Sequence, residues 1–531
     1  PMVFDGDDGE MLLDINITPE MVTKKLSTLK QSSAPGPDGI HPRVLKECAA
    51  EIGLPLSIIF RMSLDSGILP REWKSTNICP IFKKGKKDDP ANYRPINLAS
   101  VPAKVMEQLV KDAIQEHLSL HRLISSSQHG FLPGRSCTTN LIEHMNRITR
   151  TLDKGQAYDT ILLDYRRAFD KVPFRHMLAK LKSHGIGGRI FEWISDWTRS
   201  RTQRVVLNGE QSDIIDVTSS VVQGSVLGPI LFIIFINDLD AAIDLANDVH
   251  ISKFADDTKL SKKIMDINDC HKLQKALDEL TLWSEKWGME LHPDKCCVLH
   301  FGHNNPRNTY TINGKALSPT TSARDLGVTV CENASSTQHV NNVARKAQGV
   351  LSQMKRTLTF CDSRTFTSIY RTYVRPMVEF SVEAWNPYKV EDINTLEKVQ
   401  RRALRMVTDQ GNATYDSKLK KIGMTTLQER RQRGDMILVF KLMNDMTGLD
   451  KNDFFNFVRD RHTVETRSRC ADLLVPEQCH LNVRKHFFSC RVVNQWNSLP
   501  ENVRESFSVN SFKNNYDEFL QTTVSGNDQS I

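Results

Sequence analysis

The sequence predicts an α+β protein that ends in a helical region, and two observations carry this prediction. Apolar runs of strand length alternate with amphipathic helical patterns through the first 330 residues, without the regular strand–helix–strand repeat that predicts a parallel sheet. From about residue 338 onward the pattern is helical. The chain of 531 residues is long enough for about two to four domains.

The elements of the first hundred residues are indicated by caps and turns. Thr18 and Pro19 have the positions of an N-cap and a first helical residue, which predicts a helix from there. A Pro/Gly loop follows at 33–42, and an apolar helical pattern covers 44–64. Residues 76–98 contain a short strand, a turn rich in lysine and a second strand.

Residues 159–330 hold the remaining strands that we expect. The run 159–173 indicates a buried strand followed directly by a helix, and Asn208-Gly209 is a strong hairpin signal. The other expected elements, in order, are a buried helix at 229–239, short strands around 250–260, a helix at about 268–287, and strands at 289–301 and 324–330.

The composition is that of a globular protein with a small excess of positive charge. Lys and Arg number 70 against 63 Asp and Glu, and the net charge of +7 permits a nucleic-acid partner without requiring one. The 11 cysteines are odd in number and lack the dense spacing of a disulfide scaffold, so we expect reduced thiols in an intracellular protein. The longest apolar run, 228–236, is too short to span a bilayer.

Two adjacent aspartates, Asp256 and Asp257, interrupt the apolar run at 250–260. Neighbouring carboxylates repel each other unless cations neutralise them, and Mg²⁺ prefers such hard oxygen ligands. A tight hairpin would present both at its tip, and Asp164, which follows three apolar residues, would complete a two-metal site from the end of a neighbouring strand. Taken alone, the aspartate pair is more typical of a solvated turn; Asp164 favours the metal site without deciding for it.

Several motifs occur together, in one order and with compatible spacing. They are SSAPGPDGIHPRVLKE, ICPIFKKG, DPANYRPINLASVPAKVMEQLV, QHGFLPGRSCTTNL, LLDYRRAFDKVPF, QGSVLGPILFIIFINDL, KFADDTKL, MELHPDKC and DLGVTV, with FFSCRVVNQWNSLP near the C-terminus. In this combination the chain resembles, over nearly its whole length, the reverse transcriptases of non-LTR retrotransposons (LINE elements) of the jockey and chicken-repeat type. The motifs are highly specific as a set, although each alone is not.

The resemblance implies a right-hand polymerase fold: fingers, a palm with an antiparallel sheet, a helical thumb and a further helical C-terminal region. The domains expected from it are a helical N-terminal extension at 1–62, the reverse transcriptase domain with fingers and palm at 63–332, the thumb at 333–412 and the C-terminal region at 413–531. It also implies an RNA-directed DNA polymerase, which transfers nucleotides from dNTPs onto a DNA 3′ end on an RNA template.

The family's functional residues carry over position by position. Asp164, Asp256 and Asp257 match the carboxylates that bind two Mg²⁺ ions, with Mn²⁺ as an alternative, and Lys295 matches the lysine that protonates the leaving pyrophosphate. Phe169 matches the bulky steric gate that clashes with a 2′-hydroxyl. The other residues matched to dNTP binding are Lys83, Lys84, Arg94, Gln223 and Gly224.

Several of these residues also have an ordinary structural interpretation. Phe169 could be a core aromatic, Lys83 and Lys84 a solvated basic turn, Gly224 a turn glycine, and Lys295 a surface lysine. Without the resemblance, the structural interpretation is favoured for Phe169 and for the three lysines, whereas the two interpretations of Gly224 are equally supported.

One stretch departs from the family pattern. Between Asp164 and the Ala-Phe pair the family usually carries a small or acidic-plus-lysine pair, whereas this chain has Tyr165, Arg166 and Arg167. Two arginines there would either compete with the metal ions or contact template phosphates. The departure supports a second hypothesis, a catalytically decayed retroelement relic that binds nucleic acid. Asp170, six residues after Asp164, is interpreted as structural.

Residues 395–407 are predicted to form an amphipathic helix. Apolar residues recur at helical spacing on one face, and Lys398, Arg401, Arg402 and Arg405 recur on another. In a helical region after the palm, this basic face would contact the template–primer backbone. The alternative is an ordinary solvated basic helix.

The partners implied by the resemblance are an RNA template, a DNA primer and dNTPs, without a membrane. The family also implies a ribonucleoprotein of the nucleus and cytoplasm, and an endonuclease domain that precedes the polymerase in the intact element. A third hypothesis is a related polymerase, either an RNA-templated RNA polymerase or an intron maturase. Phe169 argues against the use of ribonucleotides.

Overall fold

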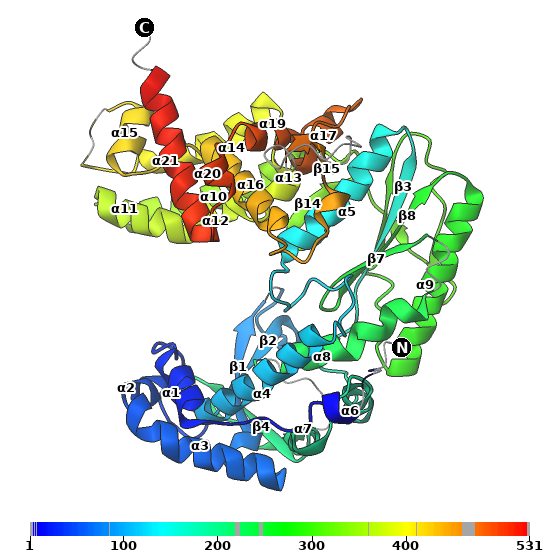
Figure 1. Ribbon diagram of the computed structural model, residues 1–531, viewed down its shortest axis with the longest axis vertical. Helices are drawn as coiled ribbons and strands as arrows, with labels where there is room; N and C mark the ends of the chain where they lie inside the picture. Colours follow the sequence, from blue (N-terminus) through cyan, green and yellow to red (C-terminus); the bar gives the residue numbers. More distant parts are fainter. Residues whose placement is uncertain are drawn as a thin grey trace.

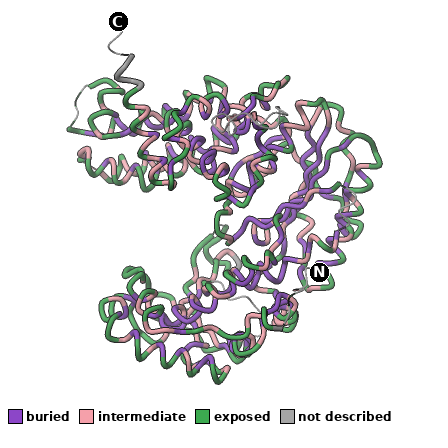
Figure 2. Tube along the Cα trace, in the orientation of Figure 1, coloured by how far each residue is buried: buried purple, intermediate pink, exposed green. Residues whose placement is uncertain are grey.

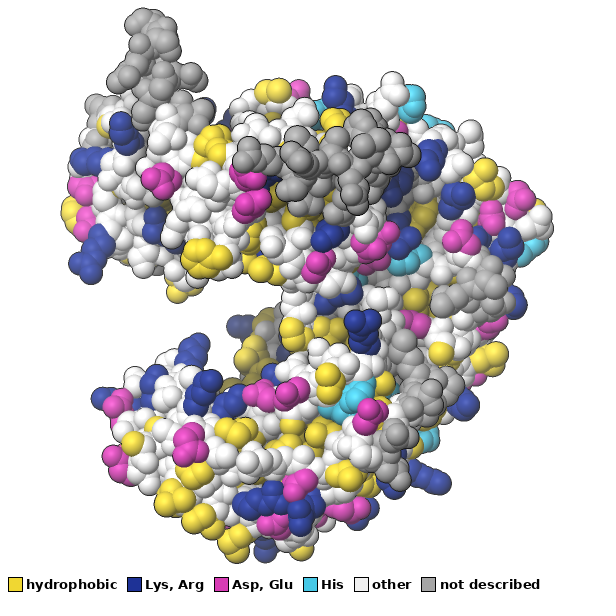
Figure 3. Space-filling view, in the orientation of Figure 1, with side chains coloured by type: hydrophobic (Ala, Val, Ile, Leu, Met, Phe, Trp, Pro, Cys, Tyr) yellow, Lys and Arg dark blue, Asp and Glu magenta, His cyan; other side chains and the backbone are white. Residues whose placement is uncertain are grey.

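A computed structural model shows two arms joined by a central body, which together have the outline of a C (Figure 1). The structure describes the chain except for residues 1–3, 5, 7, 84, 218–223, 244–247, 359, 410, 412, 459–472 and 528–531. Figure 3 shows a wide cleft between the arms, with Lys and Arg side chains along the edge of the N-terminal arm that faces it. Every helix among the described residues is too short or too polar to serve as a membrane span.

Three helices form the tip of the N-terminal arm. The first is the predicted one, α1 (Pro19–Ser27), and its N-cap Thr18 accepts a hydrogen bond from the Met21 N–H at 3.3 Å. The single helical pattern expected at 44–64 is divided into α2 (Pro42–Glu47) and α3 (Ala49–Ser66). The cause is Cys48, which leaves helical geometry between them at φ −97° and ψ 21°.

A five-stranded sheet follows, with the strand order β2-β1-β4-β5 and β6 (Ile215–Val217) paired to β4. The predicted hairpin with its lysine-rich turn is confirmed as β1 (Ser75–Phe82) and β2 (Tyr93–Ala99). β4 (Arg201–Leu207) runs parallel to β1 and turns into β5 (Glu210–Gln211) at the predicted Asn-Gly pair.

The body is built on the central sheet, our name for the five strands in the order β12-β9-β3-β8-β7. β3 (Ala157–Leu163) lies in its middle, antiparallel to β8 (Asp257–Ile264) on one side and to β9 (Cys297–Phe301) on the other. β7 (His250–Phe254) and β12 (Ser318–Pro319) are the edge strands. The strand hairpin expected around 250–260 is therefore present as β7 and β8.

Helices pack around both sheets. The apolar run expected to be a buried helix is α8 (Gly228–Ile236), and its residues from Ile230 onward are almost fully buried. α9 (Ile267–Trp287) covers the outer side of the central sheet (Figure 1), and its limits are close to those predicted. The other long helices of this half are α4 (Val101–Leu120), α5 (Cys137–Asp153), α6 (Phe174–Ser183) and α7 (Gly188–Thr198).

The expectation of a helix directly after β3 is wrong. The backbone N–H of Arg166 donates to the Glu290 carbonyl at 2.8 Å, and Tyr165 forms an isolated antiparallel bridge with Leu291. Arg167 then adopts a positive φ of 51°, which a helix does not allow. Pairing with a segment more than a hundred residues away thus overrides the local helical pattern, and α6 begins only at Phe174.

The C-terminal arm is mainly helical, as predicted. It contains the long helices α10 (Thr337–Thr357), α14 (Val390–Leu404), α16 (Leu427–Met443) and α21 (Val509–Asn527). Its shorter α-helices are α11 (Ser363–Ile369), α12 (Arg375–Glu379), α13 (Val382–Trp385), α15 (Tyr415–Lys421), α17 (Asn482–Lys485), α18 (Phe488–Arg491), α19 (Val493–Asn497) and α20 (Glu501–Arg504). Its short strands are the hairpin β13 (Ser322–Asp325) and β14 (Val328–Cys331), which contains the strand expected at 324–330, and the pair β15 (Asn456–Phe457) and β16 (Leu474–Val475). A further hairpin, β10 (Thr311–Ile312) and β11 (Lys315–Ala316), belongs to the body.

Buried apolar side chains form two clusters, and their distribution along the chain is visible in Figure 2. One cluster spans the N-terminal arm and the body. The other joins α5 and the neighbouring strands to the C-terminal arm. Polar contacts support the same junction: Asn146 of α5 donates to the Asp453 carbonyl and accepts from the fully buried Arg484, each at 2.8 Å. The C-terminal arm is therefore packed directly on the body.

Candidate active site

Three carboxylates lie at one end of the central sheet, at the ends of β3 and β8. The last residue pair of the β3–β8 ladder is Leu163 with Thr258, so Asp164 and Asp257 occupy the next position in the same register. Asp256 lies beside Asp257 in the tight turn between β7 and β8. The structure thus brings the three aspartates named from the sequence to the same edge of the sheet.

Burial and neighbouring carboxylates raise the pKa of Asp256 and of Asp257. Burial by the surrounding protein, followed by the charges of Asp256, Asp325 and Asp164, raises the pKa of Asp257 to about 6. Burial and the charge of Asp164 also raise the pKa of Asp256, while the positive charge of Arg94 lowers it. The edge of the sheet therefore carries negative charge that nearby cations do not fully compensate.

Asp164 is fixed through its backbone by the segment that precedes β9. Its N–H donates to Cys296 Sγ at 3.4 Å, and its carbonyl accepts from the His292 N–H at 2.8 Å. Lys295, in the same turn, places its Nζ 3.4 Å from Asp164 Oδ1. The lysine that the sequence assigned to proton donation therefore lies beside the first carboxylate.

A divalent cation suits the chemistry of this donor set. Carboxylate oxygens are the ligands that Mg²⁺ prefers, and bound cations would stabilise the charged forms of Asp256 and Asp257, whose pKa values are raised by burial and by mutual repulsion. Among the described residues, no three His, Cys, Asp or Glu side chains are already arranged around one point as metal ligands. Asp164, Asp256 and Asp257 are thus the residues that would hold such ions, and Lys295 already engages one of them.

Phe169 lies in the turn between β3 and α6 and is half-buried. Its ring stacks on Phe232 of α8, with ring centroids 4.2 Å apart and planes inclined by 19°. Phe131 meets it edge-on at 6.5 Å and also lies 6.4 Å from Phe254, the last residue of β7. Two aromatic neighbours therefore hold the ring next to the strand that leads to the aspartate turn.

The residues matched to dNTP binding are only partly described. Arg94 of β2 is exposed, and its charge reaches Asp256. Lys83 is also exposed, at the start of the lysine-rich turn. Gly224 has a φ of 101°, and a Cβ there would lie 2.9 Å from the Asn97 carbonyl oxygen, so glycine allows a close approach to β2. Lys84 and Gln223 lie outside the described residues.

Arg166, one of the two arginines that depart from the family pattern, is paired with a carboxylate outside the three-aspartate cluster. Its guanidinium forms an ion pair with Glu290 at 3.1 Å, and Lys171 binds the same carboxylate. Arg167 is exposed in the turn that follows. Charge competition at the candidate site is therefore smaller than the sequence suggests, because Glu290 neutralises Arg166.

The basic helix predicted at 395–407 is α14 and the residues just after it. Its apolar face is buried, as predicted, through Leu396, Val399, Ala403 and Val407. Its basic side chains are exposed on the other face: Lys398, Arg401, Arg402 and Arg405. Figure 1 places α14 in the C-terminal arm, across the cleft from the N-terminal arm, so these residues are not part of the carboxylate cluster.

Two charged residues near the site were missed by the sequence analysis. Asp325 of β13 is buried and acts on the pKa of Asp257, and its carboxylate binds Lys259 Nζ at 2.6 Å. Lys259 lies two residues after Asp257 on β8 and is itself buried. Its position within the KFADDTKL motif was the available signal, because a lysine on a buried strand requires a partner.

Comparisons with known proteins agree with this geometry. Residues 82–330 match the family described as "Reverse transcriptase (RNA-dependent DNA polymerase)". This match implies a polymerase fold with fingers and palm for residues 82–330, which contain the whole central sheet.

Several curated proteins are similar over about three quarters of the chain. The RNA-directed DNA polymerase from mobile element jockey of Drosophila melanogaster is 25% identical over 402 residues, covering 74% of this chain and 44% of its own length. The corresponding jockey protein of Drosophila funebris is 28% identical over 403 residues, with the same coverage of 74% and 44%. The probable RNA-directed DNA polymerase from transposon BS of Drosophila melanogaster is 24% identical over 402 residues, covering 73% of this chain and 44% of its own length.

The chain spans less than half the length of these curated relatives. The family match covers the central sheet and the carboxylate edge, and the similarity to the retrotransposon proteins extends beyond it. Residues 82–330 thus match the reverse transcriptase family, and about three quarters of the chain is similar to RNA-directed DNA polymerases of the retrotransposons jockey and BS.

Proposed function

We propose that this chain is an RNA-directed DNA polymerase that extends a DNA 3′ end with dNTPs on an RNA template. The observation that carries the proposal is the convergence of Asp164, Asp256 and Asp257 at one edge of the central sheet. The match of residues 82–330 to the reverse transcriptase family supports it. We further propose that the cleft holds the template and primer, and that the protein acts in a ribonucleoprotein of the nucleus and cytoplasm.

The reaction joins the primer 3′-oxygen, whose hydroxyl proton is lost to solvent, to the α-phosphorus of the dNTP. It breaks the bond between the α-phosphorus and the bridging oxygen of the pyrophosphate. Divalent ions, when bound, supply Lewis-acid stabilisation of the attacking and leaving oxygens. Asp164, Asp256 and Asp257 hold these ions. Lys295 donates a proton to the leaving pyrophosphate, and its Nζ lies beside Asp164.

The remaining residues bind and select the nucleotide. Arg94 binds the triphosphate, because a guanidinium suits phosphate oxygens and its charge already reaches the carboxylate edge. The Phe169 ring, held by Phe232, contacts the sugar and excludes a 2′-hydroxyl. We assign Lys83, Lys84, Gln223 and Gly224 to the same nucleotide site by their match to the family. The exposed basic residues of α14 bind the template–primer backbone.

The experiment that tests the proposal is primer extension on RNA with Mg²⁺, comparing the wild type with an Asp256→Asn/Asp257→Asn double variant. Asp278→Asn, a change of the same kind on α9, is the control. We expect the wild type and the control to extend the primer, and the extension rate of the double variant to fall by at least about 100-fold. Changing residues that only support metal ligands lowers activity by about 10–100-fold, so removing two ligands should lower it further.

Extension by the double variant at the wild-type rate would refute the site. Absence of extension by the wild type with either Mg²⁺ or Mn²⁺ would refute the activity and favour the relic hypothesis. That hypothesis is not favoured here, because Arg166, which motivated it, is paired with Glu290.

A further inference from the structure

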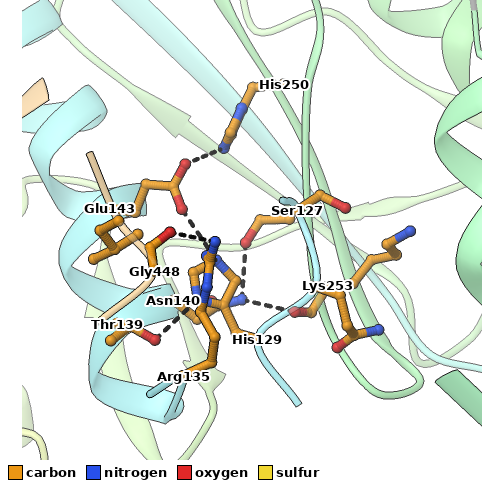
Figure 4. A network of polar contacts seen from close by, with 12 residues as sticks. Ser127, His129, Arg135, Thr139, Asn140, Glu143, His250, Lys253 and Gly448 are labelled. Carbon is orange, nitrogen blue, oxygen red and sulfur yellow. Dashed lines mark hydrogen bonds and ion pairs between the residues drawn. The ribbon is translucent and has the colours of Figure 1, made fainter. Parts of the chain in front are cut away.

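A short segment before α5 extends the central sheet beside the aspartate turn. Residues 127–130, which we call the splint, run parallel to the edge strand β7. The Lys253 N–H donates to the Ser127 carbonyl and the His129 N–H donates to the Lys253 carbonyl, both at 2.8 Å. Figure 4 shows Ser127 and His129 next to Lys253 in this arrangement. The splint therefore occupies the hydrogen-bonding edge that β7 would otherwise leave open.

Gln128 connects the splint to the turn that carries the aspartates. Its side chain is buried, with 1% exposed, and its Oε1 accepts hydrogen bonds from the Ala255 N–H at 2.9 Å and the Gly130 N–H at 2.8 Å. Ala255 directly precedes Asp256, is buried, and has a φ of 55°, which is unfavourable for alanine. Without Gln128, this buried N–H would lose its hydrogen-bond acceptor.

The backbones of the splint and the turn are in direct contact at Gly130. A Cβ at this position would lie 2.5 Å from the Ala255 nitrogen. Only glycine therefore allows the splint to approach closely enough for the Gln128 side chain to reach the turn.

Two anchors fix the splint to the rest of the body. On one side, Asp240 binds the fully buried Lys253 Nζ at 2.7 Å and accepts from Ser127 Oγ at 2.6 Å, so that β7 and the splint share one carboxylate. On the other side, the ring of His129 lies 2.9 Å from Thr139 Oγ1 and 3.0 Å from Glu143 Oε2, both on α5 (Figure 4). Side-chain contacts thus hold the splint at Ser127 and at His129.

We infer that Gln128 is a positioning residue for the metal ligands: through the Ala255 amide it fixes the turn that presents the Asp256 and Asp257 carboxylates. The inference rests on the proposed function, because the ligands that Gln128 positions are those of the proposed metal site. It is expected on physical grounds, because metal ligands must be held within a fraction of an ångström and their supporting hydrogen bonds affect metal affinity.

The test uses three variants of the full chain. Gln128→Met keeps the shape and removes the acceptor. Gln128→Glu keeps an oxygen that can accept both N–H groups. Gln274→Met is the matched control, because Gln274 Oε1 accepts from the Thr311 N–H at 2.9 Å in a part of the body that holds no proposed site residue.

Two measurements do not depend on catalysis. Hydrogen exchange should show a protected Ala255 amide in the wild type and in the Gln128→Glu and Gln274→Met variants, and faster exchange in Gln128→Met. Titration of the free chain with Mn²⁺, followed by the electron paramagnetic resonance of the unbound ion, should show affinity weakened by about 10–100-fold in Gln128→Met alone. In extension assays that variant should need more Mg²⁺ and lose kcat, while its KM for dNTP stays near the wild-type value.

A purely structural role would lower the folded fraction of both methionine variants without changing the Mn²⁺ affinity of the folded protein. That result, or an unprotected Ala255 amide in the wild type, would overturn the inference. Equal loss of Mn²⁺ affinity in Gln128→Met and Gln128→Glu would also overturn it, because the acceptor would then be irrelevant. Failure of the wild type to extend any primer would refute only the proposed function. The exchange and Mn²⁺ measurements would still decide the role of Gln128.

Discussion

Asp164 and Asp257 lie level with each other on adjacent antiparallel strands, one position beyond the pair Leu163–Thr258 that ends their ladder. The charge of Asp164 contributes to the raised pKa of Asp257, so the two carboxylates interact. The relationship depends on strand register, because a slip of one residue would turn one of the two side chains to the other face of the sheet.

Lys295 is expected to act in the chemical step. Lys295→Met should lower kcat by about 100-fold with little change in the KM for dNTP, in line with the loss of a general acid. Lys295→Arg keeps the charge but scarcely releases a proton, so it should remain slow. Lys315→Met is a control, because Lys315 of β11 forms an ion pair with Asp294, the residue directly before Lys295, and has no proposed role in the reaction. Steady-state kinetics that give a wild-type kcat for Lys295→Met would exclude this role.

Phe169 is expected to set sugar selection. Phe169→Ala should reduce the preference for dNTPs over ribonucleotides by roughly 10–200-fold, the range over which packing contacts discriminate between substrates. Phe169→Tyr keeps the ring and should retain the preference. The measurement is the ratio of kcat/KM for a dNTP and its ribonucleotide on one template. An unchanged ratio in Phe169→Ala would show that the ring is only part of the aromatic packing with Phe232.

The basic face of α14 is expected to bind phosphates. Lys398→Gln and Arg405→Gln should each weaken template–primer binding and reduce the slope of log Kobs against log salt concentration by about 1, because each variant leaves one phosphate without its neutralising cation. Lys272→Gln on α9, at the outer side of the central sheet, should leave the slope unchanged. Fluorescence anisotropy at several salt concentrations gives the slopes. Equal slopes in all variants would mean that the helix face is merely solvated.

Glu383 is expected to make the stability of the C-terminal arm depend on pH. Burial, with a further contribution from Asp435, raises the pKa of Glu383 from 4.5 to about 7, although Arg491 opposes the shift. The folded state thus keeps this proton to higher pH than the unfolded chain. The contribution of Glu383 to the free energy of unfolding is therefore complete below pH 4.5 and is lost as the pH rises to about 7.

Replacing Glu383 with glutamine should remove this dependence. Glu383→Gln stays neutral, so its melting temperature should exceed that of the wild type at pH 8 and approach it at pH 5. Glu391→Gln, which changes an exposed glutamate on α14, is the control. Thermal unfolding followed by circular dichroism measures the difference. A higher melting temperature for the wild type than for Glu383→Gln at pH 8 would contradict the assigned sign.

The elements that the sequence predicted correctly are specified by residues close together in the chain. Thr18 caps its own helix, and Asn208-Gly209 turns a strand back on itself. The region after Asp164 was predicted wrongly because Arg166 pairs with Glu290, far along the chain, and not with the next helical turn. Local propensity cannot anticipate such pairing.

The candidate site shows the same limit. Asp164, Asp256 and Asp257 could be chosen because their residue types and their places at strand ends indicate metal binding. Gln128 could not be chosen, although its motif was recognised, because its partner is the Ala255 amide on another strand. Supporting contacts of this kind depend on the fold and leave no pattern in the sequence.

The most direct test of the central claim is the single-turnover rate of dNTP incorporation on an RNA template with Mg²⁺, measured for the wild type and for Asp164→Asn. Asp164 is the informative residue, because it comes from a different strand than the aspartate pair. If the three carboxylates hold the catalytic ions together, Asp164→Asn should be slower by at least about 100-fold at every Mg²⁺ concentration, while template–primer binding stays unchanged. A folded Asp164→Asn protein that incorporates dNTP at the wild-type rate would contradict the claim.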